Sequence, residues 1–259
     1  MSVNVRSVRI MRGWDWIIEG AQILSKAAGM WVSLLAALFV LSRLLLIVPL
    51  LTPLASVLLV LVTPNFIAGL AHGARALEHG KPLRFGYLVS GFLRRSAALI
   101  AVGALSLAGQ VVILVLMLQI GGDAFGSISQ ALSSGGPADD ATTQAALRAP
   151  EPRVVLAVVT GFVLLVLLLL ATGLASLLCF FESLGALSAF ALGLRACLKN
   201  LFPFAVYSAM LLTPILALMP LTVAIRQPDL GLWLMSPLLF PSLYASYKDV
   251  LVPTPTNAE

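Results

Sequence analysis

The amino-acid sequence predicts an all-α, polytopic integral membrane protein whose six transmembrane helices form three units. Each unit consists of a short amphipathic interfacial helix followed by a helical hairpin. Two observations predict this fold class. The chain is 60% hydrophobic and only 10% charged, whereas soluble domains carry about 25% charged residues. Three of its charge-free runs are Ser96–Gly122, Val154–Phe181 and Leu201–Ile225, and each exceeds the roughly 20 apolar residues that cross a bilayer as a helix.

Other membrane architectures fit the sequence less well. A β-barrel needs segments of about ten residues in which apolar and polar side chains alternate. The segment Val163–Leu170 is apolar at every position, so helices are favoured. We also expect no cleavable signal peptide, because the basic N-terminus continues into Asp15 and Glu19 rather than into a short apolar core with a small-residue cleavage site.

The first unit opens the membrane domain, which we assign to residues 14–250. Residues 1–13 are predicted to be a disordered basic tail. From Trp14 onward, apolar residues recur at helical spacing and charged residues occupy the opposite face, which predicts an amphipathic helix on the cytoplasmic membrane surface. The first hairpin is predicted at about residues 30–48 and 54–71, because Pro49 and Pro53 between them cannot continue a helix.

The second and third units repeat this pattern without repeating residue identities. In the second, the basic segment Tyr87–Arg95 precedes spans at about residues 96–120 and 154–180. The outer loop 121–152 between those spans is rich in Gly, Ser and Pro and is predicted to be mobile, with at most a helical stretch over 141–147. In the third unit, Phe190–Asn200 precedes spans at about residues 201–225 and 230–247. The last span is the weakest and contains two prolines, and residues 251–259 are predicted to be a disordered tail.

The basic residues predict the orientation. With six spans, twelve Lys and Arg residues fall on the inner side and three on the outer side, which is the bias that orients membrane proteins. Both termini are therefore predicted to be cytoplasmic. The net charge of +5 is explained by topology and contact with lipid headgroups, so no nucleic-acid partner is expected.

The sequence contains no motif for a phosphate-binding loop, a dinucleotide fold, a zinc protease or a serine hydrolase. His72 and His79 lack the companion ligands of a metal site, and Cys179 and Cys197 are interpreted as small apolar residues. We therefore predict that the protein is not an enzyme and has no catalytic residue, cofactor or metal site.

Two polar residues inside predicted spans form a candidate intramembrane site. Arg43 is the one formal charge well within a span, and intramembrane charges are costly and often functional. It either reaches the outer headgroups or pairs with an acidic residue such as Asp123, or it serves an ion or substrate. Asn65, beside Pro64, either bonds between helices or marks a broken helix that binds a transported solute.

Four parts of the sequence share features with a known family: Gly13-Trp14, residues between Thr63 and Phe85, the segment Arg195–Tyr207 and the segment Ser242–Asp249. Together they resemble an uncharacterised family of inner-membrane proteins of proteobacteria, chiefly betaproteobacteria. The resemblance implies a bacterial inner membrane and a six-helix fold, but no particular activity. The matching residues would lie at the cytoplasmic ends of the helices, and we call the following seven the polar layer: Arg75, Arg195, Asn200, Tyr207, Tyr244, Tyr247 and Asp249.

The polar layer is expected to dock the interfacial helices onto the spans, and it is also suited to bind lipid headgroups or a partner. The sequence thus predicts an accessory or scaffold protein of the inner membrane that contacts lipid, another membrane protein or a second copy of itself. The alternative is a carrier for a lipid or an apolar small solute.

Overall fold

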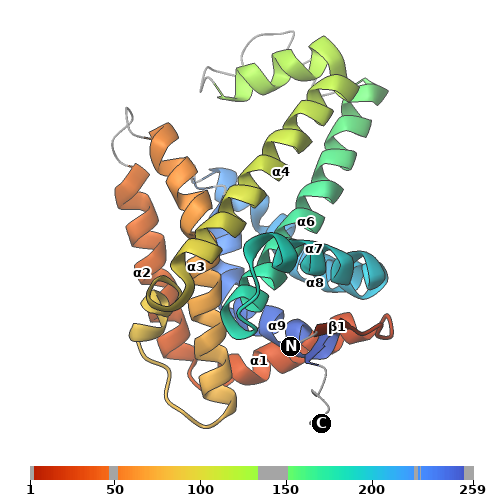
Figure 1. The fold of residues 1–259 in the computed structure, drawn as a ribbon. Coiled ribbons are helices and arrows are strands. Elements are labelled where there is room, and N and C mark those ends of the chain that lie inside the picture. The colour runs from red at the N-terminus through yellow and green to blue at the C-terminus, as the bar shows by residue number, and fades with distance from the viewer. Residues whose placement is uncertain (1–2, 47–51, 134–150, 225–226, 228, 254–259) are drawn as a thin grey trace. The chain divides into compact units, whose positions relative to one another are not determined.

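The computed structural model describes residues 3–46, 52–133, 151–224, 227 and 229–253. The chain divides into two compact units, made of residues 1–105 with 170–259 and of residues 106–169. Within the described residues the fold is helical, as predicted, apart from two short strands (Figure 1). The elements are β1 (Val3–Val5), α1 (Arg12–Ser25), α2 (Ala28–Leu46), α3 (Thr52–Glu78), α4 (Gly86–Ser133), α6 (Pro152–Phe181), α7 (Ala186–Lys199), α8 (Leu201–Ala224), α9 (Leu230–Val250) and β2 (Leu251–Pro253).

Five helices of the described chain are long and apolar enough to cross a membrane. The qualifying stretches are Ala28–Leu45, Thr52–Glu78, Gly86–Asp123, Pro152–Phe181 and Leu201–Ala224. The sixth predicted span forms helix α9, but α9 is not among them. Its serines, tyrosines and prolines dilute its apolar content. The helices fit a membrane protein, and the number of six spans stays a prediction.

Helix α1 packs along α9 and the start of α8 in the larger unit (Figure 1). Its Trp16 side chain is fully buried, and the Trp16 ring centroid lies 4.9 Å from that of Phe204. Gly13 permits this close approach, because a Cβ atom there would lie 2.9 Å from the backbone nitrogen of Tyr207. The amphipathic helix predicted from Trp14 onward is therefore present, and it is held by an apolar side chain and a backbone contact.

Helices α3 and α4 cross at two glycines, one from each helix. A Cβ atom on Gly69 would lie 3.0 Å from the carbonyl oxygen of Leu88, and a Cβ atom on Gly91 would lie 2.8 Å from the carbonyl carbon of Asn65. Small residues let membrane helices approach until their backbones touch. The two glycines thus set the distance between α3 and α4 near the loop that joins them.

The two ends of the chain pair with each other, which corrects the prediction of disordered tails. Strands β1 and β2 are antiparallel, with Val3 opposite Pro253 and Val5 opposite Leu251. The backbone N–H of Arg6 then donates to the carbonyl of Val250 at 2.8 Å. Residues 3–5 and 251–253 are therefore ordered by pairing across the whole chain, a contact that no local pattern indicates. Residues 254–259 lie outside the described chain.

Helix α4 differs from its prediction at both ends. The basic segment expected as a separate surface helix is the first part of α4, and the helix continues through residues 121–133, which were assigned to a mobile loop. In the smaller unit, Phe125 of this extension is buried against Val154 and Ala157 of α6, and burial of its ring favours helix over loop. Residues 134–150 of the predicted loop, with the expected helical stretch over 141–147, lie outside the described chain, and Pro152 begins α6.

Candidate functional site

Asp249, at the end of α9, is the polar-layer residue with the most elaborate contacts. Its carboxylate accepts hydrogen bonds from Arg12 Nε at 2.7 Å and from the indole N–H of Trp16 at 3.0 Å. Arg12 also contacts Asp15 and Glu19. These bonds, chiefly the one with Asp249, hold the pKa of Arg12 above its ordinary value. Asp249 therefore ties the start of α1 to the end of α9.

Two further members of the polar layer bind the N-terminal segment and helix α9. The side chain of Asn200, at the end of α7, accepts from the backbone N–H of Val8 and donates to the carbonyl of Arg6, both at 2.9 Å. The hydroxyl of Tyr207, on α8, lies 3.0 Å from Ser242 Oγ and is buried. Asn200 thus holds the segment between β1 and α1, and Tyr207 joins α8 to α9.

The remaining tyrosines of the polar layer bind two glutamates that were not assigned to it. Tyr244 donates to Glu78 Oε2 at 2.8 Å, and Tyr247 donates to Glu182 Oε1 at 2.9 Å. Glu78 also forms an ion pair with Lys248. Each glutamate is an acidic residue at the end of an apolar helix, and that position is the signal that would have found them. Helices α3 and α6 are in this way bonded to α9.

Arg195 and Arg75 do not join these bonds. Arg195 is exposed on α7 and forms no ion pair or side-chain hydrogen bond within the described chain. Arg75 is exposed on α3, and its guanidinium carbon lies 5.1 Å from the centroid of the Phe181 ring. Within the described chain, five of the seven residues therefore make hydrogen bonds through their side chains, whereas Arg75 lies over an aromatic ring and Arg195 is exposed.

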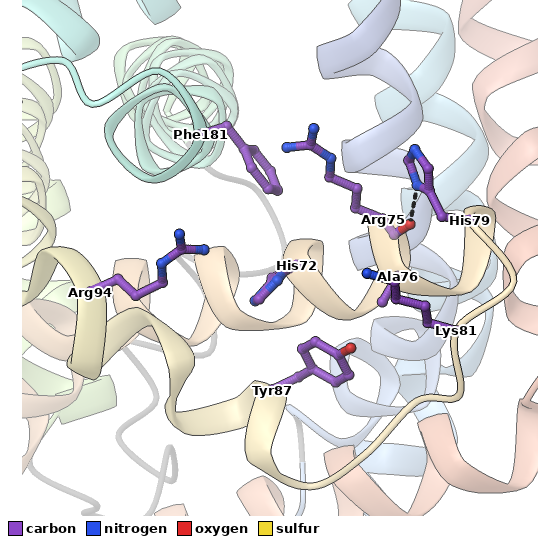
Figure 2. Close-up of a pocket in the computed structure, with 8 residues that line it drawn as sticks. All are labelled: His72, Arg75, Ala76, His79, Lys81, Tyr87, Arg94 and Phe181. Atoms are coloured by element: carbon purple, nitrogen blue, oxygen red, sulfur yellow. Dashed lines mark hydrogen bonds between the residues drawn. The ribbon is translucent and has the colours of Figure 1, made fainter.

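Arg75 lines a cavity of about 330 Å³ at the end of α3 (Figure 2). The lining comes from α3, from the loop after it, and from the ends of α4 and α6 that belong to the larger unit. In Figure 2, His72 lies between Arg94 and Arg75, with Phe181 above it and Tyr87 below it in the view. We call this cavity the cationic pocket, and its lining residues are His72, Arg75, Ala76, His79, Lys81, Tyr87, Arg94 and Phe181.

The two intramembrane candidates lie apart from the cationic pocket and differ from each other. Arg43 on α2 forms an ion pair with Asp229 at the start of α9, and Asp229 also accepts from the indole N–H of Trp233 at 3.2 Å. The pairing partner is therefore Asp229, whereas Asp123 was the example chosen from the sequence. Asn65 is fully buried on α3, and neither polar atom of its amide has a partner in the described structure.

The histidines and cysteines are the described side chains to consider for metal binding and for thiol chemistry. No group of three or more His, Cys, Asp or Glu side chains in the described residues is arranged to hold a metal ion. Cys179 and Cys197 are both buried free thiols. Burial raises the pKa of Cys197 to about 12, so this thiol stays protonated near neutral pH and lacks the reactive thiolate form.

The geometry thus defines a helical protein with several helices able to cross a membrane, a hydrogen-bonded polar layer at one end of the larger unit, and a cationic pocket beside it. Comparison of the chain with protein-family models, with curated proteins and with solved structures finds no match.

Proposed function

We propose that the protein is a non-enzymatic accessory or scaffold protein of a bacterial inner membrane that contacts lipid or another membrane protein. Helix α1 carries this proposal. On its buried face, Trp16 and Ile23 pack against the rest of the larger unit. On its other side, Trp14 and Ile18 are 44% and 42% exposed. A helix that is apolar on its outward face suits the headgroup region of a membrane, where tryptophan is enriched.

The polar layer supports a structural rather than a catalytic use of these residues. Asn200, Asp249 and Tyr207 hold the N-terminal segment, α1 and α8 in place, and the carboxylates of Glu78 and Glu182 each accept a tyrosine hydroxyl. General acid–base catalysis needs groups that can reach a substrate and exchange a proton with it. The side chains named above are engaged in joining helices, and Asp249 fixes α1 to α9, which suits a scaffold.

Six spans with both termini in the cytoplasm are part of the proposal. The pairing of β1 with β2 holds residues 3–5 next to residues 251–253, and chain ends that pair lie on one side of a membrane. The number of crossings is then even, so α9 would join the five apolar helices as the sixth span. The arrangement of α1 before α2 and α3, and of α7 before α8 and α9, also supports units of a surface helix and a hairpin.

Native mass spectrometry of the protein, extracted gently from its own membrane, tests the accessory role. We expect a stoichiometric complex with another membrane protein or with a second copy of the chain, because the exposed apolar side chains of α1 offer a contact surface. Recovery of a single chain that carries one tightly held apolar metabolite, and no protein partner, would contradict the accessory role and favour a carrier.

The carrier remains the second candidate because of Asn65. A buried amide with no partner loses its bonds to water without replacement, which costs about 1–3 kcal/mol. We therefore expect Asn65→Leu, measured by thermal unfolding in detergent, to be as stable as the wild type or more stable. In a carrier that uses the amide to bind a solute, the same variant would lose solute uptake into proteoliposomes; unchanged uptake would contradict a role of Asn65 in transport.

A further inference from the structure

The cationic pocket gathers positive charge from three separate chain segments. Arg75 comes from α3, Lys81 from the loop after α3, and Arg94 from α4. All three cations act electrostatically on His72, which lies among them. No carboxylate belongs to the lining, so the charge of the pocket is not balanced from within.

The two carboxylates that lie next to pocket residues in the sequence bind other side chains. Glu78, three residues after Arg75, binds Lys248 and Tyr244, and Glu182, next to Phe181, accepts the hydroxyl of Tyr247. Within the described chain Arg75, Lys81 and Arg94 form no ion pair. Like charges held together without a counter-ion repel one another, and an anion in the pocket would remove that repulsion.

Aromatic rings hold the two guanidinium groups in place. The guanidinium carbon of Arg75 lies 5.1 Å from the centroid of Phe181, and that of Arg94 lies 5.5 Å from the centroid of Phe180. A cation over an aromatic ring is attracted to the ring face while its N–H groups stay available. These contacts favour positions of the two arginines near Phe180 and Phe181, which lowers the entropic cost of binding.

We propose that the cationic pocket binds a phosphate group, presented either by an anionic phospholipid headgroup or by a soluble phosphate ester. Guanidinium groups match the geometry of phosphate oxygens and a lysine adds a point charge. The volume of about 330 Å³ lies at the low end of the range for small-molecule sites, about 300–1,000 Å³. The lipid source rests on the proposed function, since it requires this end of α3 to lie at the headgroup level.

The first experiment measures lipid binding to the full-length protein in detergent micelles by native mass spectrometry. Phosphatidylglycerol is titrated against diacylglycerol with the same acyl chains, which lacks the phosphate. We expect the wild type to retain phosphatidylglycerol and not diacylglycerol. The double variant R75Q/R94Q should weaken phosphatidylglycerol binding by about tenfold or more, because it removes two charge-assisted contacts.

A matched control removes two positive charges outside the pocket. R9Q/R84Q changes exposed arginines that neither line the cavity nor belong to the polar layer, so general attraction between the protein and anionic lipid falls by the same two charges. We expect less than a twofold change for this control. Lys81→Gln supplies a further test if R75Q/R94Q fails to fold, since Lys81 is exposed on the loop; about a threefold loss is expected.

The second arm distinguishes the source of the phosphate. Displacement of phosphatidylglycerol by millimolar glycerol 3-phosphate or inorganic phosphate would assign the pocket to soluble phosphates, whereas resistance to both would assign it to a lipid headgroup. Equal retention of diacylglycerol, or equal losses in R75Q/R94Q and R9Q/R84Q, would overturn the proposal. Absence of a protein partner in membrane extracts would count against the accessory role alone, because the lipid titration does not depend on a partner.

Discussion

Replacing Gly91 with alanine is expected to destabilise the protein by about 1–3 kcal/mol, the usual range for overpacking. The new Cβ atom would lie 2.8 Å from the carbonyl carbon and 2.9 Å from the Cα atom of Asn65. Both are backbone atoms, so no rotamer change relieves the clash and α3 and α4 must move apart. Thermal unfolding of the purified variant in detergent measures the loss.

Gly86 on the same helix provides the matched control. A Cβ atom there would meet nothing within 4 Å, and alanine favours helix over glycine by up to about 1 kcal/mol. Gly86→Ala is therefore expected to unfold at the same temperature as the wild type or slightly above it. If both alanine variants unfold together, the close approach of α3 and α4 contributes nothing to stability. Because Tyr87 and Arg94 flank Gly91, we also expect Gly91→Ala to alter the cationic pocket.

The helices were predictable because their signals are local. A charge-free run such as Val154–Phe181 identifies a helix from composition alone, and α6 covers this run. The helical spacing of apolar residues from Trp14 likewise predicts α1, which begins at Arg12. By contrast, α4 runs without a break through Arg94 and Arg95, because two adjacent charges change the polarity of a helix without ending its backbone hydrogen bonds.

The contacts that join the ends of these helices were not predictable, since they link residues far apart in the chain. Arg43 pairs with Asp229 across 186 positions, and Tyr244 bonds Glu78 across 166. A single sequence identifies a charge within an apolar span that needs a partner, but it does not indicate which acidic residue folds beside it. The N-terminal segment is a further example. Its basic composition predicts a disordered tail, whereas in the structure β1 pairs with β2 at the other end of the chain.

The polar layer contains residues that have a bonding partner in the structure and one, Arg195, that is exposed. The resemblance of parts of the sequence to a known family predicts Asn200, Tyr207 and Asp249 as members of the polar layer. In the structure each has a definite hydrogen-bond partner. Arg195 belongs to the same resemblance and is expected at the same level, yet it is exposed. Sequence position places a residue at a level along a helix, whereas the direction of its side chain depends on how that helix packs.

Replacing Asp249 with alanine is expected to cost about 3 kcal/mol, since hydrogen bonds to charged groups contribute about 1.5–3 kcal/mol and their loss leaves buried donors unpaired. The indole N–H of Trp16 and the Nε of Arg12 both lose their acceptor. Trp16 is fully buried, so water does not reach it without movement of α1. We expect a lower unfolding temperature and faster trypsin cleavage after Arg6, Arg9 and Arg12, because α1 is released from α9.

Arg195→Ala separates this effect from a general sensitivity of the polar layer. Arg195 is exposed and has no ion-pair partner in the described chain, and surface substitutions of this kind usually change stability by no more than about 0.5 kcal/mol. The variant should therefore match the wild type in unfolding temperature and in trypsin cleavage of the N-terminal segment. Equal behaviour of Asp249→Ala and the wild type would show that the bonds from Asp249 do not hold α1, and the polar layer would then lose its role in docking the surface helix.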